Sequence, residues 1–170
     1  FMSRPLDPVL SPRSIAVVGA SRSPSTIGHQ ILANLVKYGY TGTVFPVNPN
    51  AAAVHAIKAW HSLSAISDPV DMALVCVPKD LVAQVAMEAG EKGVRAIVVI
   101  SAGFREVDGE GAAREQELVA ICRRYGMRLV GPNCMGVLNA DPAVSMNATF
   151  APSMPPFGHA AFVSQSGAMG

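Results

Sequence analysis

The residues of this sequence best suited to chemistry lie in a loop of glycines and hydroxyl side chains near the N-terminus. Gly19 ends an apolar run over residues 15–18, and from Ile27 the apolar residues change to helical spacing. The hydroxyl side chains between them are Ser21, Ser23, Ser25 and Thr26. A strand, a glycine turn and a helix N-terminus in that order direct unpaired backbone N–H groups and the helix dipole at the loop. The loop therefore predicts an anion site for a nucleotide-like ligand that carries a pyrophosphate.

The same loop departs from the G-x-G-x-x-G pattern of dinucleotide-binding proteins. Ser21 stands in place of the second glycine, and six residues separate it from Gly28. The next predicted strand, residues 44–47, ends in Asn48 and Pro49, where a nicotinamide-binding protein usually carries an acidic residue. Both departures disfavour NAD. A second interpretation stays open, in which the loop glycines only permit a tight turn and close helix packing.

The elements that must position this loop follow a strand-then-helix order along the chain. Continuous apolar runs predict buried parallel strands at residues 15–18, 44–47, 72–77, 96–100 and 127–130. The first helix is expected to bury one apolar stripe, made of Ile27, Ile31, Leu32, Leu35 and Val36. Asp80 is expected to cap the next helix, and Gly93 and Gly126 to end the two later helices. The alternation predicts an α/β fold, a Rossmann-like, doubly wound, mainly parallel sheet with helices on both faces.

Small and polar residues follow every predicted strand. In an open parallel sheet, ligands bind beyond the carboxyl ends of the strands. The segments at these ends are residues 19–21, 48–49, 77–78, 101–103 and 131–133. Because they carry almost no charge, they favour a long ligand that lies against backbone over a charged catalytic centre.

Composition and charge restrict the possible functions. The 170 residues are 50% hydrophobic and only 15% charged, with a net charge of +1, so neither nucleic acid nor an anionic membrane is an expected partner. No apolar run reaches about 20 residues, which is the length that spans a bilayer. Three cysteines without paired spacing indicate reduced thiols and a cytoplasmic protein. The four histidines lack metal-ligand spacing, so no metal site is expected.

Six short motifs, taken in order, resemble one known family. They are GAS at residues 19–21, VNP at 47–49, VP at 77–78, VISAGF at 99–104, GPNCMG at 131–136 and VSQSGAMG at 163–170. Together they resemble the CoA-binding domain of NDP-forming acyl-CoA synthetases, in the superfamily of the succinyl-CoA synthetase α-subunit. The resemblance implies a Rossmann-like domain with CoA across the strand-end loops, within an acid–thiol ligase that makes or consumes an acyl-CoA.

The resemblance also implies a set of ligand-contacting residues. CoA or acyl-CoA would lie against Gly19, Ala20, Ser21, Arg22, Ile27, Gly28, Asn48, Pro49, Pro78, Lys79, Ser101, Ala102, Gly103 and Asn133. A basic residue often follows the Asn-Pro pair in the family, whereas this sequence has Asn50. Arg22 and Lys79 are therefore the candidates to neutralise the CoA phosphates. No residue is expected to be catalytic.

The domain organisation follows from the same motifs. Residues 8–150 are expected to form the CoA-binding domain, 151–159 a proline-rich linker containing the surface histidine His159, and 160–170 the start of a truncated second domain. The phosphate-relay histidine and the ATP or GTP site with Mg would belong to the remaining synthetase domains or a partner subunit. This chain alone is then expected to be inactive, and it could form a homo-oligomer.

Other interpretations remain beside the ligase. The same region occurs in some protein lysine acetyltransferases, and a stand-alone CoA-binding module is a third possibility. An NAD-dependent oxidoreductase is the least favoured class. Cys134 sits in the loop after the fifth strand, and we interpret it as a thiol that packs the turn rather than as a nucleophile.

Overall fold

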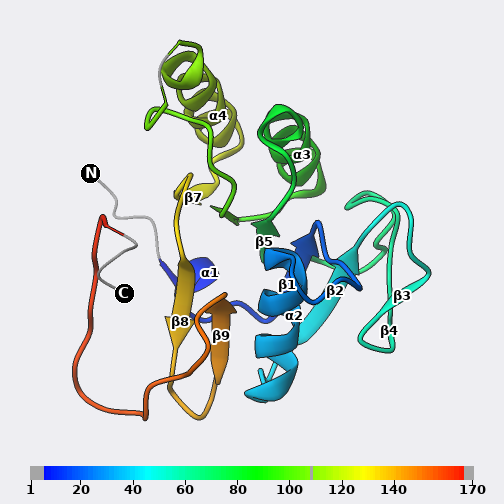
Figure 1. The fold of residues 1–170 in the computed structure, drawn as a ribbon, viewed down its shortest axis with the longest axis vertical. Helices are drawn as coiled ribbons and strands as arrows, with labels where there is room; N and C mark the ends of the chain where they lie inside the picture. The colour runs from blue at the N-terminus through cyan, green and yellow to red at the C-terminus, as the bar shows by residue number, and fades with distance from the viewer. Residues whose placement is uncertain (1–5, 108, 167–170) are drawn as a thin grey trace.

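A computed structural model describes residues 6–107 and 109–166, and its main sheet confirms the predicted α/β architecture. Five parallel strands are arranged in the order β2-β1-β5-β6-β7 (Figure 1). Their bounds are β1 Ser14–Val18, β2 Thr43–Val47, β5 Met72–Val75, β6 Ala96–Val99 and β7 Arg128–Val130. Every residue of β1, β5 and β6 is buried, which is why the sequence shows these strands as continuous apolar runs.

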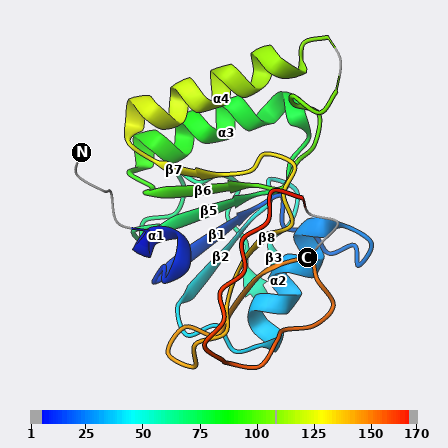
Figure 2. The ribbon, with the colours of Figure 1, turned by 90° about the vertical axis from the view of Figure 1, so that its left-hand side faces the viewer.

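Helices cover both faces of the sheet (Figure 2). They are α1 Asp7–Leu10, α2 Ile27–Lys37, α3 Lys79–Lys92 and α4 Gly111–Tyr125. Alternate residues of β1 enter two separate cores: Ala16 and Val18 lie with residues of α3 and α4, and Ile15 and Val17 lie with residues of α1 and α2. The Rossmann-like prediction is thereby confirmed.

The helix boundaries agree with the sequence at some positions and differ at others. Gly93 and Gly126 end α3 and α4 in the left-handed conformation, as predicted. Asp80 does not cap α3: Pro78 holds that position, and the Asp80 carboxylate lies 3.7 Å from the Arg114 guanidinium instead.

The apolar stripe of α2 is narrower than predicted. Ile31, Leu32 and Leu35 are buried, but Ile27 and Val36 are 41% and 51% exposed. Helical spacing puts these two residues at the margins of the stripe, where the sheet no longer covers them.

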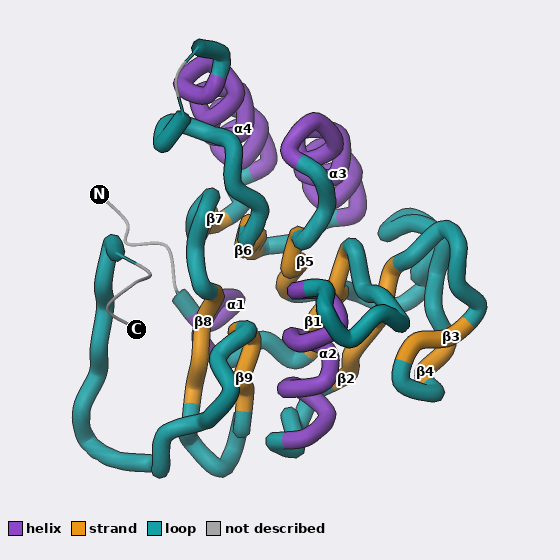
Figure 3. The backbone as a smooth tube through the Cα atoms, in the orientation of Figure 1, coloured by secondary structure: helices purple, strands orange, loops and turns teal. Residues whose placement is uncertain are grey.

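Two β-hairpins were not predicted from the sequence (Figure 3). The first pairs β3 (Ala53–Val54) with β4 (Ile57–Lys58), and its turn places His55 and Ala56 at φ of 51° and 62°. Positive φ favours glycine, so the alanine at position 56 is strained.

The second hairpin pairs β8 (Gly136–Asn139) with β9 (Met146–Thr149) and returns to the face of the sheet that α2 covers. All four residues of β9 are buried. The Asn34 amide of α2 donates hydrogen bonds to the carbonyl oxygens of Thr149 (2.8 Å) and Ala151 (2.9 Å), which fixes the helix to the hairpin.

The buried carboxylate of Asp71 lies at the edge of the sheet where the strands begin, opposite to their carboxyl ends. Asp71 precedes β5 and accepts hydrogen bonds from the Arg13 backbone N–H (2.8 Å) and the Arg95 guanidinium (2.7 Å). Burial alone would raise the pKa of Asp71, but these hydrogen bonds and the two positive charges outweigh it and lower the pKa below its ordinary value. Asp71 therefore ties together the starts of β1, β5 and β6.

Residues 152–166 leave the body of the domain as an extended, mostly exposed segment without helix or strand. No strand forms over residues 160–166, where a second domain is expected to start. The second domain therefore stays a prediction, and residues 167–170 of it lie outside the described residues. None of the described helices has the length and apolar character needed to cross a membrane.

Candidate functional site

The loops after β1 and β5 meet where the strand order of the sheet reverses. From β1 the chain passes to β2 on one side, and from β5 it continues to β6 and β7 on the other. A Cβ on Gly19 would lie only 2.7 Å from the Cys76 carbonyl oxygen, and Gly19 has a φ of +92°. Only glycine meets both conditions without strain. Such a reversal point is where open α/β sheets bind their ligands.

Gly28 brings the N-terminus of α2 against the loop after β1. A Cβ at this position would lie 2.1 Å from the Gly19 carbonyl oxygen and 3.3 Å from the Ala20 Cα. The close packing that the sequence left open as an alternative is therefore present. It also has a functional consequence, because it holds the first turn of α2 directly beside the loop.

The hydroxyl side chains of the loop mostly bond to the loop itself. Thr26 precedes α2, but its hydroxyl donates to the Ser23 carbonyl oxygen (2.8 Å) and does not cap the helix. The Ser21 hydroxyl accepts from the Ser23 N–H (3.1 Å), and the Ser23 and Ser25 hydroxyls lie 3.1 Å apart. Within the part of the chain that the structure describes, no side chain accepts from the first-turn amides of α2, and an anion can bind there.

Asn48 acts as an anchor for this loop. Its Nδ2 donates to the Ala20 carbonyl oxygen (2.6 Å), and its Oδ1 accepts from the Asn50 N–H (2.8 Å). An aspartate could not make the first of these bonds, which explains in physical terms why the acidic residue of nicotinamide-binding proteins is absent here. Pro49, beside it, is exposed.

The loop after β6 connects three strand ends. The Ser101 hydroxyl donates to the Val77 carbonyl oxygen (2.5 Å), and the Asn133 N–H donates to the Ser101 carbonyl oxygen (3.0 Å). The structure therefore brings the predicted residues from the loops after β5, β6 and β7 together at one edge of the sheet. Pro78, Ala102 and Asn133 are exposed along this edge.

Glu106 is a residue of this edge that sequence reasoning missed. Its carboxylate accepts from the backbone N–H groups of Gly103 (2.5 Å) and Phe104 (3.1 Å). Although burial acts in the opposite direction, these backbone hydrogen bonds lower the pKa of Glu106. The Gly103 amide is thus occupied by a carboxylate of the same chain. No sequence signal other than the short spacing of three residues could have indicated this contact.

Two basic side chains remain without an ionic partner at the site. Arg22 and Lys79 are exposed, and within residues 6–107 and 109–166 neither makes an ion pair or a side-chain hydrogen bond. A Cβ on Gly103 would meet the Lys79 Cδ at 2.5 Å, so the lysine stem crosses this glycine. Both cations are free to meet an anionic ligand.

The cysteines at this edge are protonated thiols. Burial raises the pKa of Cys76 to about 12 and, with a smaller opposing effect of backbone hydrogen bonds, raises that of Cys134. The Cys134 thiol donates to the Val99 carbonyl oxygen over 3.3 Å. Since a nucleophilic cysteine needs a lowered pKa, these features favour the packing interpretation of Cys134.

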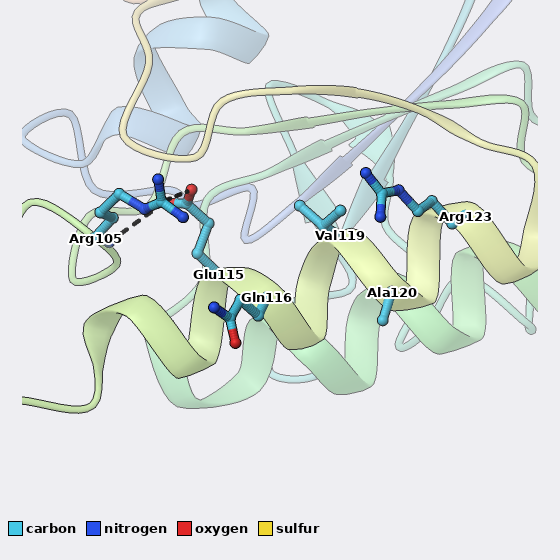
Figure 4. Close-up of a pocket in the computed structure, with 6 residues that line it drawn as sticks. All are labelled: Arg105, Glu115, Gln116, Val119, Ala120 and Arg123. Carbon is cyan, nitrogen blue, oxygen red and sulfur yellow. Dashed lines mark hydrogen bonds and ion pairs between the residues drawn. The ribbon is translucent and has the colours of Figure 1, made fainter.

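A groove of about 380 Å³ lies elsewhere, along α4 (Figure 4). It is lined by Arg105, Glu115, Gln116, Val119, Ala120 and Arg123. Arg105 and Glu115 form an ion pair across one end, with 3.4 Å between Nε and Oε1. None of the lining residues belongs to the strand-end set, and the groove is not part of the candidate site.

The fold and the strand-end site together define a nucleotide-binding α/β domain, and comparison with known proteins specifies its family. Residues 13–140 match the CoA binding domain family, and the chain belongs to this family.

Relatives extend the comparison over nearly the whole chain. The chain is 46% identical over 165 residues to the "acetate–CoA ligase [ADP-forming] II subunit alpha" of Pyrococcus furiosus, covering 97% of this chain and 35% of the relative. It is 43% identical over 162 residues to the "4-hydroxybutyrate–CoA ligase [ADP-forming]" of Nitrosopumilus maritimus, covering 95% of this chain and 23% of that one.

A solved structure gives the same result. The "dinucleotide forming acetyl-coenzyme A synthetase 1" of Ca. Korarchaeum cryptofilum, in complex with phosphate and ADP, matches with a TM-score of 0.92 and 46% identity. The match covers 97% of this chain and 35% of that chain. The chain therefore spans between about a quarter and a third of the length of the proteins it matches.

Proposed function

We propose that this chain is the CoA-binding part of an NDP-forming acyl-CoA ligase, with the CoA pyrophosphate at the first turn of α2. The observation that carries the proposal is that Gly28 holds this uncapped turn against the loop after β1, at the reversal point of the sheet. Backbone N–H groups and the helix dipole stabilise a phosphate there.

The rest of the strand-end edge suits the remainder of a long ligand. The exposed Pro49, Pro78 and Ala102 offer an uncharged surface, and Arg22 and Lys79 offer unpaired positive charge. CoA has this character, since its phosphates are anionic and its pantetheine arm is neutral. The membership of the CoA binding domain family supports the same ligand.

The acid and the nucleotide are assigned to other parts of the ligase. The chain matches relatives named for two different acids, acetate and 4-hydroxybutyrate, over at least 95% of its length. Those two ligases share CoA and ADP formation and differ in the acid, so this domain does not choose the acid, and its family membership assigns CoA to it. The phosphate relay and nucleotide turnover then require further domains or a partner subunit, and the 170-residue chain forms no acyl-CoA from acid, ATP and CoA.

Calorimetric titration of the chain with CoA and with NAD tests the proposal. CoA should bind saturably and raise the Tm by mass action, and NAD should do neither. Asn48→Asp should weaken CoA binding at least tenfold, because it removes the donor to the Ala20 carbonyl oxygen and adds a negative charge. Asn50→Asp is the matched control, since it adds the same charge and keeps the anchor. Tighter binding of NAD than of CoA would refute the proposal.

A further inference from the structure

Two histidines from separate elements meet beside the loop after β1. His29 lies in the first turn of α2 and His55 in the turn between β3 and β4, with ring centroids 4.3 Å apart and ring planes tilted by 48°. The His29 Nδ1 lies 3.0 Å from the Ser21 carbonyl oxygen. The hairpin therefore reaches the loop through a contact between two imidazole rings.

The hydrogen bond to Ser21 fixes what His29 can offer to a ligand. A carbonyl oxygen only accepts, so the proton of this bond belongs to His29 Nδ1. In the neutral ring, Nε2 then carries a lone pair and has nothing to donate to a phosphate oxygen. Only the imidazolium presents an N–H at Nε2. The His55 ring has no hydrogen-bond partner in the described part of the chain, and it can also take up a proton.

The segments that carry the pair contain no acidic residue. Between residues 8 and 67 the sequence has no Asp or Glu, and of its four cations, Arg13 pairs with Asp71 at the opposite edge of the sheet and Lys37 lies at the far end of α2. Of the elements packed on α2, β1 and β9 carry no charged residue. The loop before α2 contributes Arg22, and the hairpin contributes Lys58, whose Nζ lies 5.4 Å from the Trp60 ring centroid. These two cations and the absence of Asp and Glu from these segments favour an anionic ligand beside the pair.

We propose that His29 and His55 form a protonation-dependent contact for a phosphate group of the CoA nucleotide. The inference rests on the proposed function, which brings the CoA phosphates to the first turn of α2. Protonation supplies an Nε2–H donor at His29 and positive charge at the pair, in a chain whose Asn-Pro pair is followed by the uncharged Asn50. CoA binding therefore takes up protons, and affinity increases as the pH falls from 8 to 6, where histidine changes charge.

The size of the effect follows from linkage. An average uptake of about half a proton over two pH units corresponds to about a tenfold gain in affinity. The 3′-phosphate of CoA cannot produce this gain, because it loses negative charge as the pH falls. Dephospho-CoA lacks the 3′-phosphate, and its pyrophosphate does not change charge between pH 6 and 8. Any pH dependence of its binding therefore comes from the protein.

The test is calorimetric titration of the 170-residue chain with CoA and dephospho-CoA at pH 6.0 and 8.0, at constant ionic strength. Two buffers of different ionisation enthalpy at each pH report the proton uptake directly. The variants are His55→Asn and His29→Asn/His55→Asn. At position 29 the asparagine amide can still donate to the Ser21 carbonyl oxygen, and at position 55 asparagine tolerates the φ of 51°. His61→Asn is the matched control, because His61 is exposed and makes no contact with the pair.

The parent chain and His61→Asn should bind about tenfold more tightly at pH 6.0, with proton uptake, and the double variant should change by less than twofold. His55→Asn should lose part of the gain, and it serves as the test if the double variant does not fold. A higher affinity at pH 6.0 than at pH 8.0 for CoA, but not for dephospho-CoA, would place the pair at the 3′-phosphate and still support the proposal. Equal affinities of the parent at both pH values, or an unchanged gain in His55→Asn and the double variant, would overturn it while CoA binding stands. If the parent binds neither ligand at either pH, the proposed function itself fails.

Discussion

Replacing Gly28 by alanine tests the contact on which the site depends. The added methyl group would lie 2.1 Å from the Gly19 carbonyl oxygen, whereas side-chain carbons rarely approach closer than 3.0 Å. The helix and the loop must therefore separate by about 1 Å. The three atoms nearest to the methyl group, the carbonyl oxygen and carbon of Gly19 and the Cα of Ala20, are all backbone, so no flexible side chain can move aside.

The free-energy cost combines three effects. Overpacking of this kind costs about 1–3 kcal/mol. Moving the loop also weakens the 2.6 Å bond between Asn48 and the Ala20 carbonyl oxygen, which contributes about 0.5–1.5 kcal/mol. The higher helix propensity of alanine returns about 1 kcal/mol. Gly28→Ala should therefore lower the free energy of unfolding by about 2 kcal/mol, and the Tm by roughly 4–8 °C for a chain of this length.

Urea denaturation and CoA calorimetry measure both consequences. We expect CoA affinity to fall at least tenfold in the folded variant, because the first turn of α2 no longer meets the loop. Gly158→Ala is the control: a Cβ there meets no atom within 4 Å, and we expect stability and binding to be unchanged. If Gly28→Ala kept its stability within about 0.5 kcal/mol and bound CoA within twofold of the parent, the close helix–loop contact would not determine the site.

Three further predictions concern other parts of the molecule. Asp71→Asn should cost about 2 kcal/mol in urea denaturation at pH 7. Because the pKa of Asp71 is lowered in the folded protein, the stabilisation that its carboxylate provides is present above pH 3.8 and disappears as the pH falls through the folded pKa. A difference in stability between parent and variant that stayed constant down to pH 2 would contradict this account. The exposed Asp68→Asn is the control and should show little effect at any pH. Ala56→Gly should raise the free energy of unfolding by about 1 kcal/mol, since it relieves a φ of 62° in an L-residue, and a lowered urea midpoint would disagree. Cys134→Ala should leave the calorimetric affinity for CoA within a few-fold, and a tenfold loss in a folded variant would give the thiol a binding role.

The sheet was predictable from the sequence because parallel strands covered on both faces must be continuous apolar runs. The two hairpins were not, for different physical reasons. Strands β3 and β4 have two residues each, which is too short for any periodicity to be visible. Strand β9 reads Met-Asn-Ala-Thr and is buried although half of it is polar: the Thr149 hydroxyl donates to the Asn147 side chain over 2.6 Å, inside the fold.

The candidate site was likewise predictable from the sequence only in part. The glycine loop and its helix could be predicted, because local spacing dictates them. Asn48 was expected at the ligand, but the structure uses both ends of its amide to hold the loop. The contact between His29 and His55 could not be predicted, since it joins residues 26 positions apart through a hairpin that left no pattern. Long-range contacts of this kind depend on packing that the local sequence does not encode.

Strand β9 is the last element of this domain along the chain, so the domain cannot finish folding until the chain beyond residue 146 has been made. The bonds from Asn34 reach across 115 and 117 residues, and because β9 packs on α2 as the sheet does, the part of the helix that β9 covers stays uncovered until this strand is in place. During synthesis, an N-terminal portion ending at residue 140 would already contain every strand of the main sheet but would lack the strand that packs on α2. We expect such a portion to remain collapsed, non-cooperative and prone to self-association, and the native transition to await emergence of residues 146–151 from the ribosome.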